Sequence, residues 1–179
     1  MFYENAGIQG RMEQRGAVMS AEMEAETISL PEETKAKARD YFRQGLNCAE
    51  CVFLAFYDTH ETNLPREAVG LASGFGGGIG HTKHICGAIS GALLALGTQK
   101  GRSNPFAKET PRERSLELRE DVYPRFADLL EEVKEHYGTV LCAELTASHP
   151  DFDAPARRQS CAEIVSYCAD LCARHAEKP

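Results

Sequence analysis

Long hydrophobic runs and an excess of positive charge are both missing from this chain of 179 residues. The longest nearly uncharged run, residues 85–99, is shorter than the roughly 20 apolar residues that cross a bilayer as a helix. The start of the chain, MFYENAGIQGRMEQRG, contains no apolar segment of the kind that directs secretion. The formal net charge of -7 disfavours nucleic acids and anionic membranes as partners, since both attract basic surfaces. We therefore expect a cytoplasmic protein that binds neither a membrane nor a nucleic acid.

Several chemical signatures are missing as well. No segment alternates apolar and polar residues in the manner of a half-buried strand, so we expect no β-sheet. The CxxC pair Cys48 and Cys51 is followed by Val52 rather than by histidine, which excludes c-type haem attachment. The loop GFGGGIG lacks the preceding strand of a dinucleotide-binding loop, because residues 69–72 read as helix. These absences predict an all-α protein without covalent haem or bound dinucleotide.

Cysteine, by contrast, is abundant, with seven residues in the chain. Persistent structural disulfides are uncommon inside cells, where thiols are kept reduced. For an intracellular chain, this enrichment therefore predicts metal ligation or redox chemistry rather than cross-linking.

Cap and breaker residues predict a compact bundle of about five to six helices. Ser29 and Glu32 form a capping box that starts a first helix, and Gly45 ends it. Further helix starts are expected at Asn47, Asn63, Cys86, Pro111, Cys142 and Ser160. Pro124 lies within the longest helix, over residues 111–137, and should kink or split it. We expect residues 29–179 to form one helical redox domain, preceded by an extension over residues 1–28 in which Met19 offers an alternative start.

The centre of the chain joins a glycine-rich loop to a buried helix that begins near Cys86. Glycine serves where the backbone takes positive φ or passes close to another group. Gly87 and Gly91 are four residues apart, so they form a bare stripe against which another backbone can pack. A homodimer could use the small-residue face of this helix.

The triplet Cys-Ala-Glu occurs three times, at Cys48, Cys142 and Cys161. The cap residues Asn47 and Ser160 precede two of these cysteines, and Cys86 is expected at a similar helix start. The unpaired N–H groups of a helix N-terminus stabilise a thiolate and lower its pKa. If the four helix starts converge, they form a pocket lined with sulfur that suits a metal or a set of redox thiols.

The remaining cysteines and histidines give weaker signals. Cys51 and Cys168 lie one and two helical turns from predicted site cysteines and are possible accessory ligands, whereas Cys172 is expected in the core or at the surface. His81 and His84 could act as ligands or proton donors, but a solvated loop face is the favoured interpretation.

The glycine loop, the segment Cys86-Gly87-Ala88-Ile89-Ser90-Gly91 and the order of the four cysteines resemble a four-cysteine family of redox-active proteins with a CGAxxG motif. The resemblance covers about residues 32–172 and extends to the non-haem portion of split-Soret cytochromes, where an iron–sulfur centre accompanies the haems. It implies a small helical bundle with a redox function, and it selects as the functional set Cys48, Cys86, Cys142 and Cys161.

Three functions remain open at this point. The leading hypothesis is that these four cysteines ligate an iron–sulfur cluster that exchanges electrons with an unknown redox partner protein. The second is a thiol–disulfide oxidoreductase or redox sensor without a cofactor, in which Cys48 or Cys86 is the reactive thiol. The third is a structural zinc site, since four cysteines also suit tetrahedral zinc.

Overall fold

The computed structural model describes residues 28–179, and its helices confirm the predicted all-α fold. The elements in chain order are α2 (Leu30–Arg43), α3 (Cys48–Thr59), the 3₁₀ helix η1 (Arg66–Phe75), α4 (Gly87–Lys100), α5 (Pro111–Glu117), the π-helical segment η2 (Leu118–Val122), α6 (Tyr123–Tyr137), α7 (Cys142–Leu145) and α8 (Pro155–Glu177). The described residues contain no strand, only one isolated antiparallel bridge. The predicted extension, including Met19, lies outside the described residues except for Ile28.

The predicted cap residues set the first helix boundaries. Capping boxes form at Ser29 with Glu32 and at Asn47 with Glu50, and they begin α2 and α3. Gly45 follows α2 with a φ of 98°, a left-handed conformation that glycine adopts without a Cβ clash. The short connection between the two helices therefore brings the start of α3 back against the end of α2.

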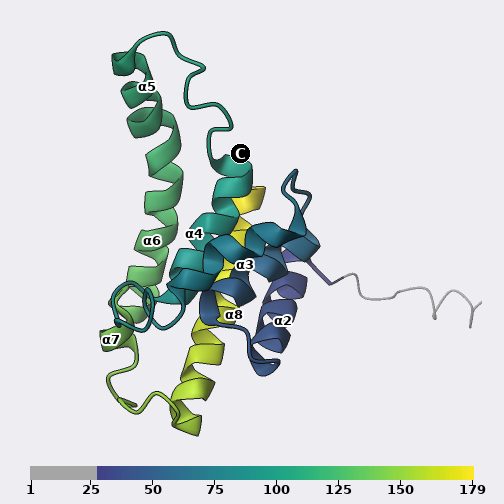
Figure 1. Cartoon of the computed structure of the whole chain (residues 1–179), viewed down its shortest axis with the longest axis vertical. Helices are drawn as coiled ribbons and strands as arrows, with labels where there is room; N and C mark the ends of the chain where they lie inside the picture. Colours follow the sequence, from purple (N-terminus) through teal and green to yellow (C-terminus); the bar gives the residue numbers. More distant parts are fainter. Residues whose placement is uncertain (1–27) are drawn as a thin grey trace, which may run out of the picture.

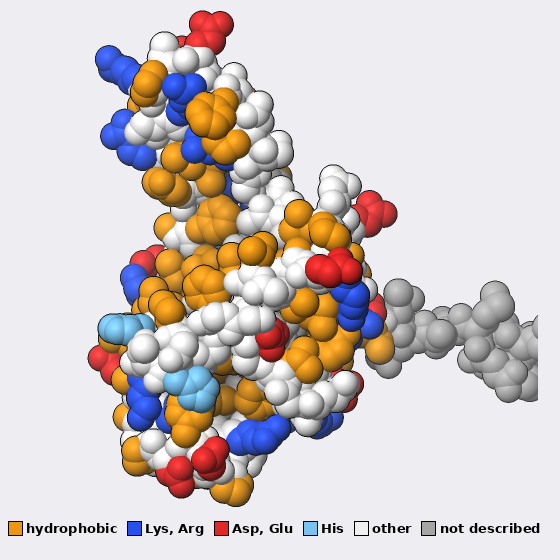
Figure 2. Space-filling view, in the orientation of Figure 1, with side chains coloured by type: hydrophobic (Ala, Val, Ile, Leu, Met, Phe, Trp, Pro, Cys, Tyr) orange, Lys and Arg blue, Asp and Glu red, His pale blue; other side chains and the backbone are white. Residues whose placement is uncertain are grey.

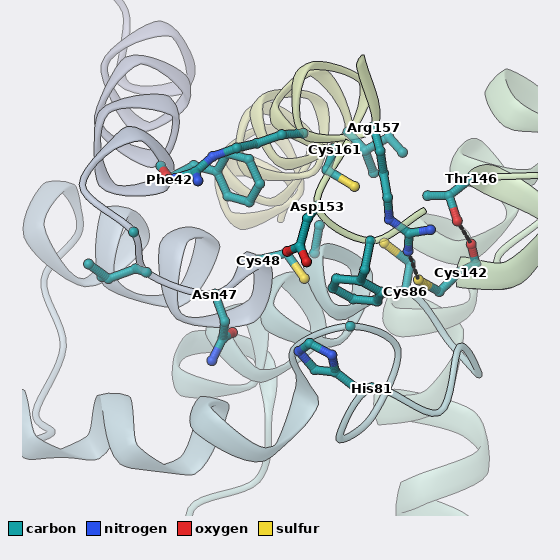
Figure 3. Close-up of a pocket in the computed structure, with 17 residues that line it drawn as sticks. Phe42, Asn47, Cys48, His81, Cys86, Cys142, Thr146, Asp153, Arg157 and Cys161 are labelled. Carbon is teal, nitrogen blue, oxygen red and sulfur yellow. Dashed lines mark hydrogen bonds between the residues drawn. The ribbon is translucent and has the colours of Figure 1, made fainter. Parts of the chain in front are cut away.

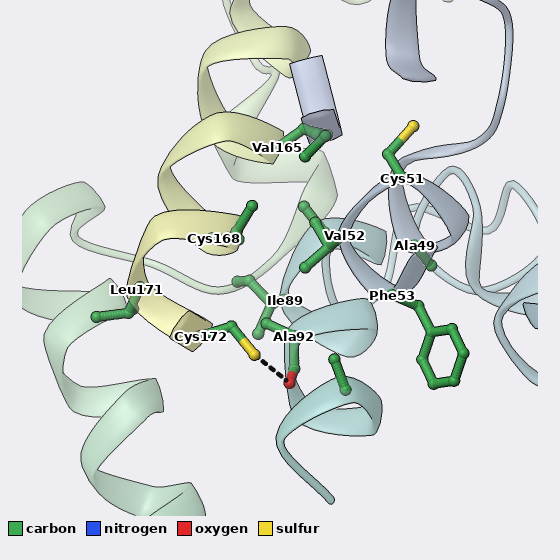
Figure 4. Close-up of a cluster of buried hydrophobic side chains, with 14 of the residues drawn as sticks. Ala49, Cys51, Val52, Phe53, Ile89, Ala92, Val165, Cys168, Leu171 and Cys172 are labelled. Carbon is green, nitrogen blue, oxygen red and sulfur yellow. Dashed lines mark hydrogen bonds between the residues drawn. The ribbon is translucent and has the colours of Figure 1, made fainter. Parts of the chain in front are cut away.

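Helices α2, α3, α4 and α8 pack around the core (Figures 1 and 4). In Figure 4 Val52 of α3, Ile89 of α4 and Val165 of α8 approach one another, and all three are fully buried. A Cβ added at Gly91 would lie 2.5 Å from the carbonyl oxygen of Ala49, so α3 and α4 pack with their backbones in contact. The predicted small-residue stripe is thus confirmed, but it is covered within the chain and offers no free face for a second copy.

The α5–η2–α6 run forms an arm along one side of the bundle (Figure 1). Proline lacks an N–H group, and its ring meets the preceding helical turn. The π-helical segment directly before Pro124 changes the hydrogen-bond pattern there, with the Tyr123 N–H donating to the Leu118 carbonyl. The predicted distortion at Pro124 is therefore confirmed. Hydrophobic side chains gather where the arm meets α4 (Figure 2), around an apolar groove of about 550 Å³.

The predicted start of the last helix is wrong, because α8 begins at Pro155 rather than at Ser160. Proline is favoured in the first turn of a helix, where its missing N–H costs nothing. Ser160 lies inside the helix, and its hydroxyl donates to the Ala156 carbonyl at 3.2 Å instead of capping. Cys161 therefore lies in the second turn and not at a helix N-terminus.

No helix among residues 28–179 is both long enough and apolar enough to cross a membrane.

Candidate functional site: a pocket lined by four cysteines

A pocket of about 360 Å³ lies where α3, α4, α7 and α8 meet, and four cysteines line it (Figure 3). Cys48 is the first residue of α3, Cys86 the N-cap of α4, Cys142 the first residue of α7, and Cys161 lies in α8. The lining also includes Gly77, His81, Phe152, Asp153, Arg157 and Arg158. The fold thus gathers into one place the four cysteines singled out by the sequence.

A backbone clamp holds two of these cysteines side by side. Ile85 and Leu141 form the isolated antiparallel bridge, and each is followed by a cysteine of the pocket. The Cys86 N–H donates to the Val140 carbonyl at 2.9 Å, and the Cys142 N–H donates to the His84 carbonyl at 2.7 Å. Both sulfur-bearing residues are therefore positioned by main-chain hydrogen bonds as well as by their helices.

Glycines allow the chain to pass directly against these cysteines. A Cβ added at Gly87 would lie 2.5 Å from the Cys48 sulfur, and one at Gly78 would lie 2.7 Å from the Cys142 Cβ. Real Cβ atoms do not approach other atoms so closely, and Gly78 also has a left-handed φ of 77°. The glycines thus serve where the backbone passes close to another group, and here that group is a pocket cysteine.

Aromatic and basic side chains stack across the pocket. The His81 and Phe152 rings are 4.2 Å apart and nearly parallel, and the Arg157 guanidinium lies 4.2 Å from the centre of the Phe152 ring. His81 and His84 are both exposed, as predicted for a loop face, but His81 also lines the pocket.

Burial dominates the acidity of three pocket thiols. It raises the pKa of Cys86 to about 12 and that of Cys161 to about 11, and it also raises the pKa of Cys48. The Cys48 and Cys142 thiols reinforce the rise at Cys86 and Cys161, because neighbouring thiolates repel one another. Hydrogen bonds from the backbone N–H groups of Ala88 and Ile89 act to lower the pKa of Cys86, as the sequence predicted for a helix start. The prediction of lowered pKa values is wrong for these three thiols, since desolvation outweighs the helix starts.

Arg157 is a pocket residue that the sequence did not reveal. Its side chain is only 2% exposed, and its Nη2 lies 3.8 Å from the Cys142 sulfur. Its Nη1 donates to the His149 carbonyl at 3.1 Å. Arg157 precedes Cys161 by one helical turn, a spacing that would have indicated a shared face had the start of α8 been predicted at Pro155.

The other three cysteines do not line the pocket. Cys51, Cys168 and Cys172 are fully buried in the core. The Cys51 sulfur donates to the Leu46 carbonyl at 3.6 Å, and the Cys172 sulfur donates to the Ala92 carbonyl at 3.3 Å (Figure 4). Their placement is that of small core residues, as expected for Cys172.

All seven cysteines are free thiols in the structure. Within residues 28–179, no group of three or more histidine, cysteine, aspartate or glutamate side chains is arranged to hold one metal ion. The four sulfurs thus share a pocket without forming a ready-made site for a single ion.

Residues 46–175 match a family model described as "putative redox-active protein (C_GCAxxG_C_C)". The chain belongs to this C_GCAxxG_C_C family. Its members are thereby described as redox-active, and the matched region contains all four pocket cysteines. An uncharacterized protein of Archaeoglobus fulgidus (strain ATCC 49558 / DSM 4304 / JCM 9628 / NBRC 100126 / VC-16) is 30% identical over 148 residues, which cover 79% of this chain and 93% of the relative. No solved structure gives a significant match to this C_GCAxxG_C_C protein.

Proposed function

We propose that this protein is an electron-transfer protein in which Cys48, Cys86, Cys142 and Cys161 ligate an iron–sulfur cluster. The observation that carries the proposal is the division of the seven cysteines. Four come from separate segments to line one pocket, whereas the other three are buried in the core. Four thiolates are the usual ligand set of such a cluster, which supplies one-electron redox chemistry when bound.

The surroundings of the sulfurs fit this ligand set. Buried thiolates need compensating positive charge, which iron and the nearby Arg157 would both supply. Backbone N–H groups of Gly77, Ala88 and Ile89 favour the thiolate forms of Cys48 and Cys86. Such donors near the sulfurs tune the potential of a cluster. The chain thus contributes ligands, amide dipoles and a partly enclosed site.

Two observations weigh against the alternatives. Structural zinc needs four ligands around one ion, whereas the described residues form no such single-ion group. A cluster accepts ligands that are further apart, because its thiolates bind different iron atoms. A thiol–disulfide oxidoreductase needs a readily formed thiolate, whereas desolvation raises the pKa of both Cys48, which is half-buried, and Cys86, which is buried. Bound iron would supply the positive charge that offsets this desolvation, whereas a free nucleophilic thiol has no such cation.

We also propose a cytoplasmic location, where a reducing environment keeps thiols free, and a one-electron carrier protein as the redox partner.

Anaerobic reconstitution of the full chain with iron and sulfide tests the proposal. We expect a coloured protein with stoichiometric iron and acid-labile sulfide whose visible absorbance bleaches reversibly with dithionite. A colourless chain without bound iron would contradict the proposal. Iron-free protein with one specific, reversible disulfide among the four cysteines, found by mass mapping, would favour the oxidoreductase instead.

A further inference from the structure

Arg157 places a permanent positive charge almost completely out of water. Its side chain is 2% exposed, although the guanidinium group remains protonated under all ordinary conditions. Burying an ion costs free energy unless an opposite charge lies close to it. A negative partner is therefore expected near this side chain.

No carboxylate among the described residues pairs with Arg157, and that includes the exposed Asp153, which lines the same pocket. The ion pairs within residues 28–179 involve other cations, and none includes Arg157. The contacts of the guanidinium group are a backbone carbonyl, an aromatic ring and the sulfur of Cys142. Of these groups, only the sulfur can carry a negative charge.

We infer that Arg157 supplies a buried positive charge beside the Cys142 sulfur that raises the reduction potential of the centre, an inference that rests on the proposed function. The His149 carbonyl and the Phe152 ring fix the guanidinium in place, so its charge acts at a set position. Reduction adds one electron to the centre from dithionite or an electrode, and Arg157 neither gains nor loses a proton. A fixed positive charge stabilises the more negative, reduced state. Arg157 is thus a positioning residue that acts through Cys142.

The test compares wild-type chain with Arg157→Gln and Arg157→Lys, each reconstituted and titrated electrochemically. We expect Arg157→Gln to lower the equilibrium constant for one-electron reduction about tenfold, which equals about 59 mV. Arg157→Lys keeps the charge and should retain most of the wild-type potential. Arg158→Gln is the matched control, since Arg158 is the next residue of α8 and also lines the pocket but is exposed to screening solvent. Its potential should move less than that of Arg157→Gln.

A second readout is the rise in thermal midpoint on loading the cluster. This rise should be smaller in Arg157→Gln than in the wild type, because the unloaded variant no longer buries an unpaired charge. A merely structural role would shift the loaded and unloaded midpoints equally. If Arg157→Gln folds but takes up less iron than Arg157→Lys, the inference is also supported.

Two results would overturn the inference. One is an Arg157→Gln potential equal to that of the wild type at full iron content. The other is failure of both Arg157 variants to fold, which would assign the side chain to the scaffold. Failure of the proposed function is distinct from both, because the wild-type chain itself would then contain no iron.

Discussion

At the scale of single residues, the pKa values of Cys48, Cys86 and Cys161 depend on burial more than on the place of each residue in a helix. The sequence correctly indicated that Cys48, Cys86 and Cys142 lie at helix starts, where backbone dipoles favour thiolates. It could not indicate that the pocket buries Cys86 and Cys142 and leaves Cys48 half-buried, because burial is set by residues distant in the chain. Arg157 illustrates the same limit, since its buried contact with Cys142 depends on where α7 docks against α8.

Substitution of Gly87 tests the close approach of α4 to the pocket. A Cβ there would meet the Cys48 sulfur at 2.5 Å and the Phe75 carbonyl oxygen at 2.6 Å. We therefore expect Gly87→Ala to lower the free energy of unfolding by about 1–3 kcal/mol, the usual cost of overpacking. Urea denaturation of the unloaded chain measures this change.

Gly97→Ala provides the control within the same helix. A Cβ at Gly97 would have only the edge of the Phe126 ring near it, at 4.0 Å. Alanine is the better helix former, so this substitution should stabilise the chain by up to about 1 kcal/mol. Equal effects of the two substitutions would contradict a tight contact at Gly87.

At the scale of elements, the sequence predicted most helix boundaries because capping is local. The boxes at Ser29 and Asn47 depend only on nearby residues, as does the end of the predicted helix over residues 111–137, where Gly138 follows with a left-handed φ of 76°. The start of α8 was misplaced because Ser160 and Glu163 have capping-box spacing inside a longer helix. The glycine stripe of α4 was predictable from the sequence. The identity of the helix that packs against it, α3, was not, because that depends on how the helices pack.

A charged cluster ties α6 to the end of α8 and predicts a pH effect. Glu132 of α6 lies 2.7 Å from His175 Nε2 and 2.9 Å from Lys178 Nζ. Burial alone would raise the pKa of Glu132, but Lys178 and His175 outweigh it and lower the pKa to about 2. A lowered carboxylate pKa stabilises the fold above about 4.5, and this stabilisation is lost as pH falls toward about 2.

The matching experiment compares thermal midpoints of wild type and Glu132→Gln over this pH range. The wild type should melt higher at neutral pH, and the difference should shrink as pH falls below about 4.5. Glu131→Gln is the control, because Glu131 is more exposed and pairs with Lys134 on the same helix. A difference between Glu132→Gln and wild type that stays constant down to acid pH would refute the stabilising role of this cluster.

At the scale of the whole molecule, the fold sorts seven cysteines into two groups. The pocket group comes from four segments that are far apart in the chain, and the core group fills space between α3, α4 and α8. Sequence position alone did not separate the groups completely, since Cys51 is one turn from Cys48 and Cys168 is two turns from Cys161. Helix packing separates them, because each of these neighbours is buried in the core.

Cluster ligation by the pocket cysteines is tested most directly by the iron and acid-labile sulfide content of seven single Cys→Ala variants after anaerobic reconstitution. Iron should be largely lost when the substitution falls at Cys48, Cys86, Cys142 or Cys161. Variants at Cys51, Cys168 and Cys172 should fold with iron near the wild-type level, since alanine suits a small buried position. Equal iron content across all seven variants, or loss confined to the core group, would contradict the assignment of the pocket cysteines as cluster ligands.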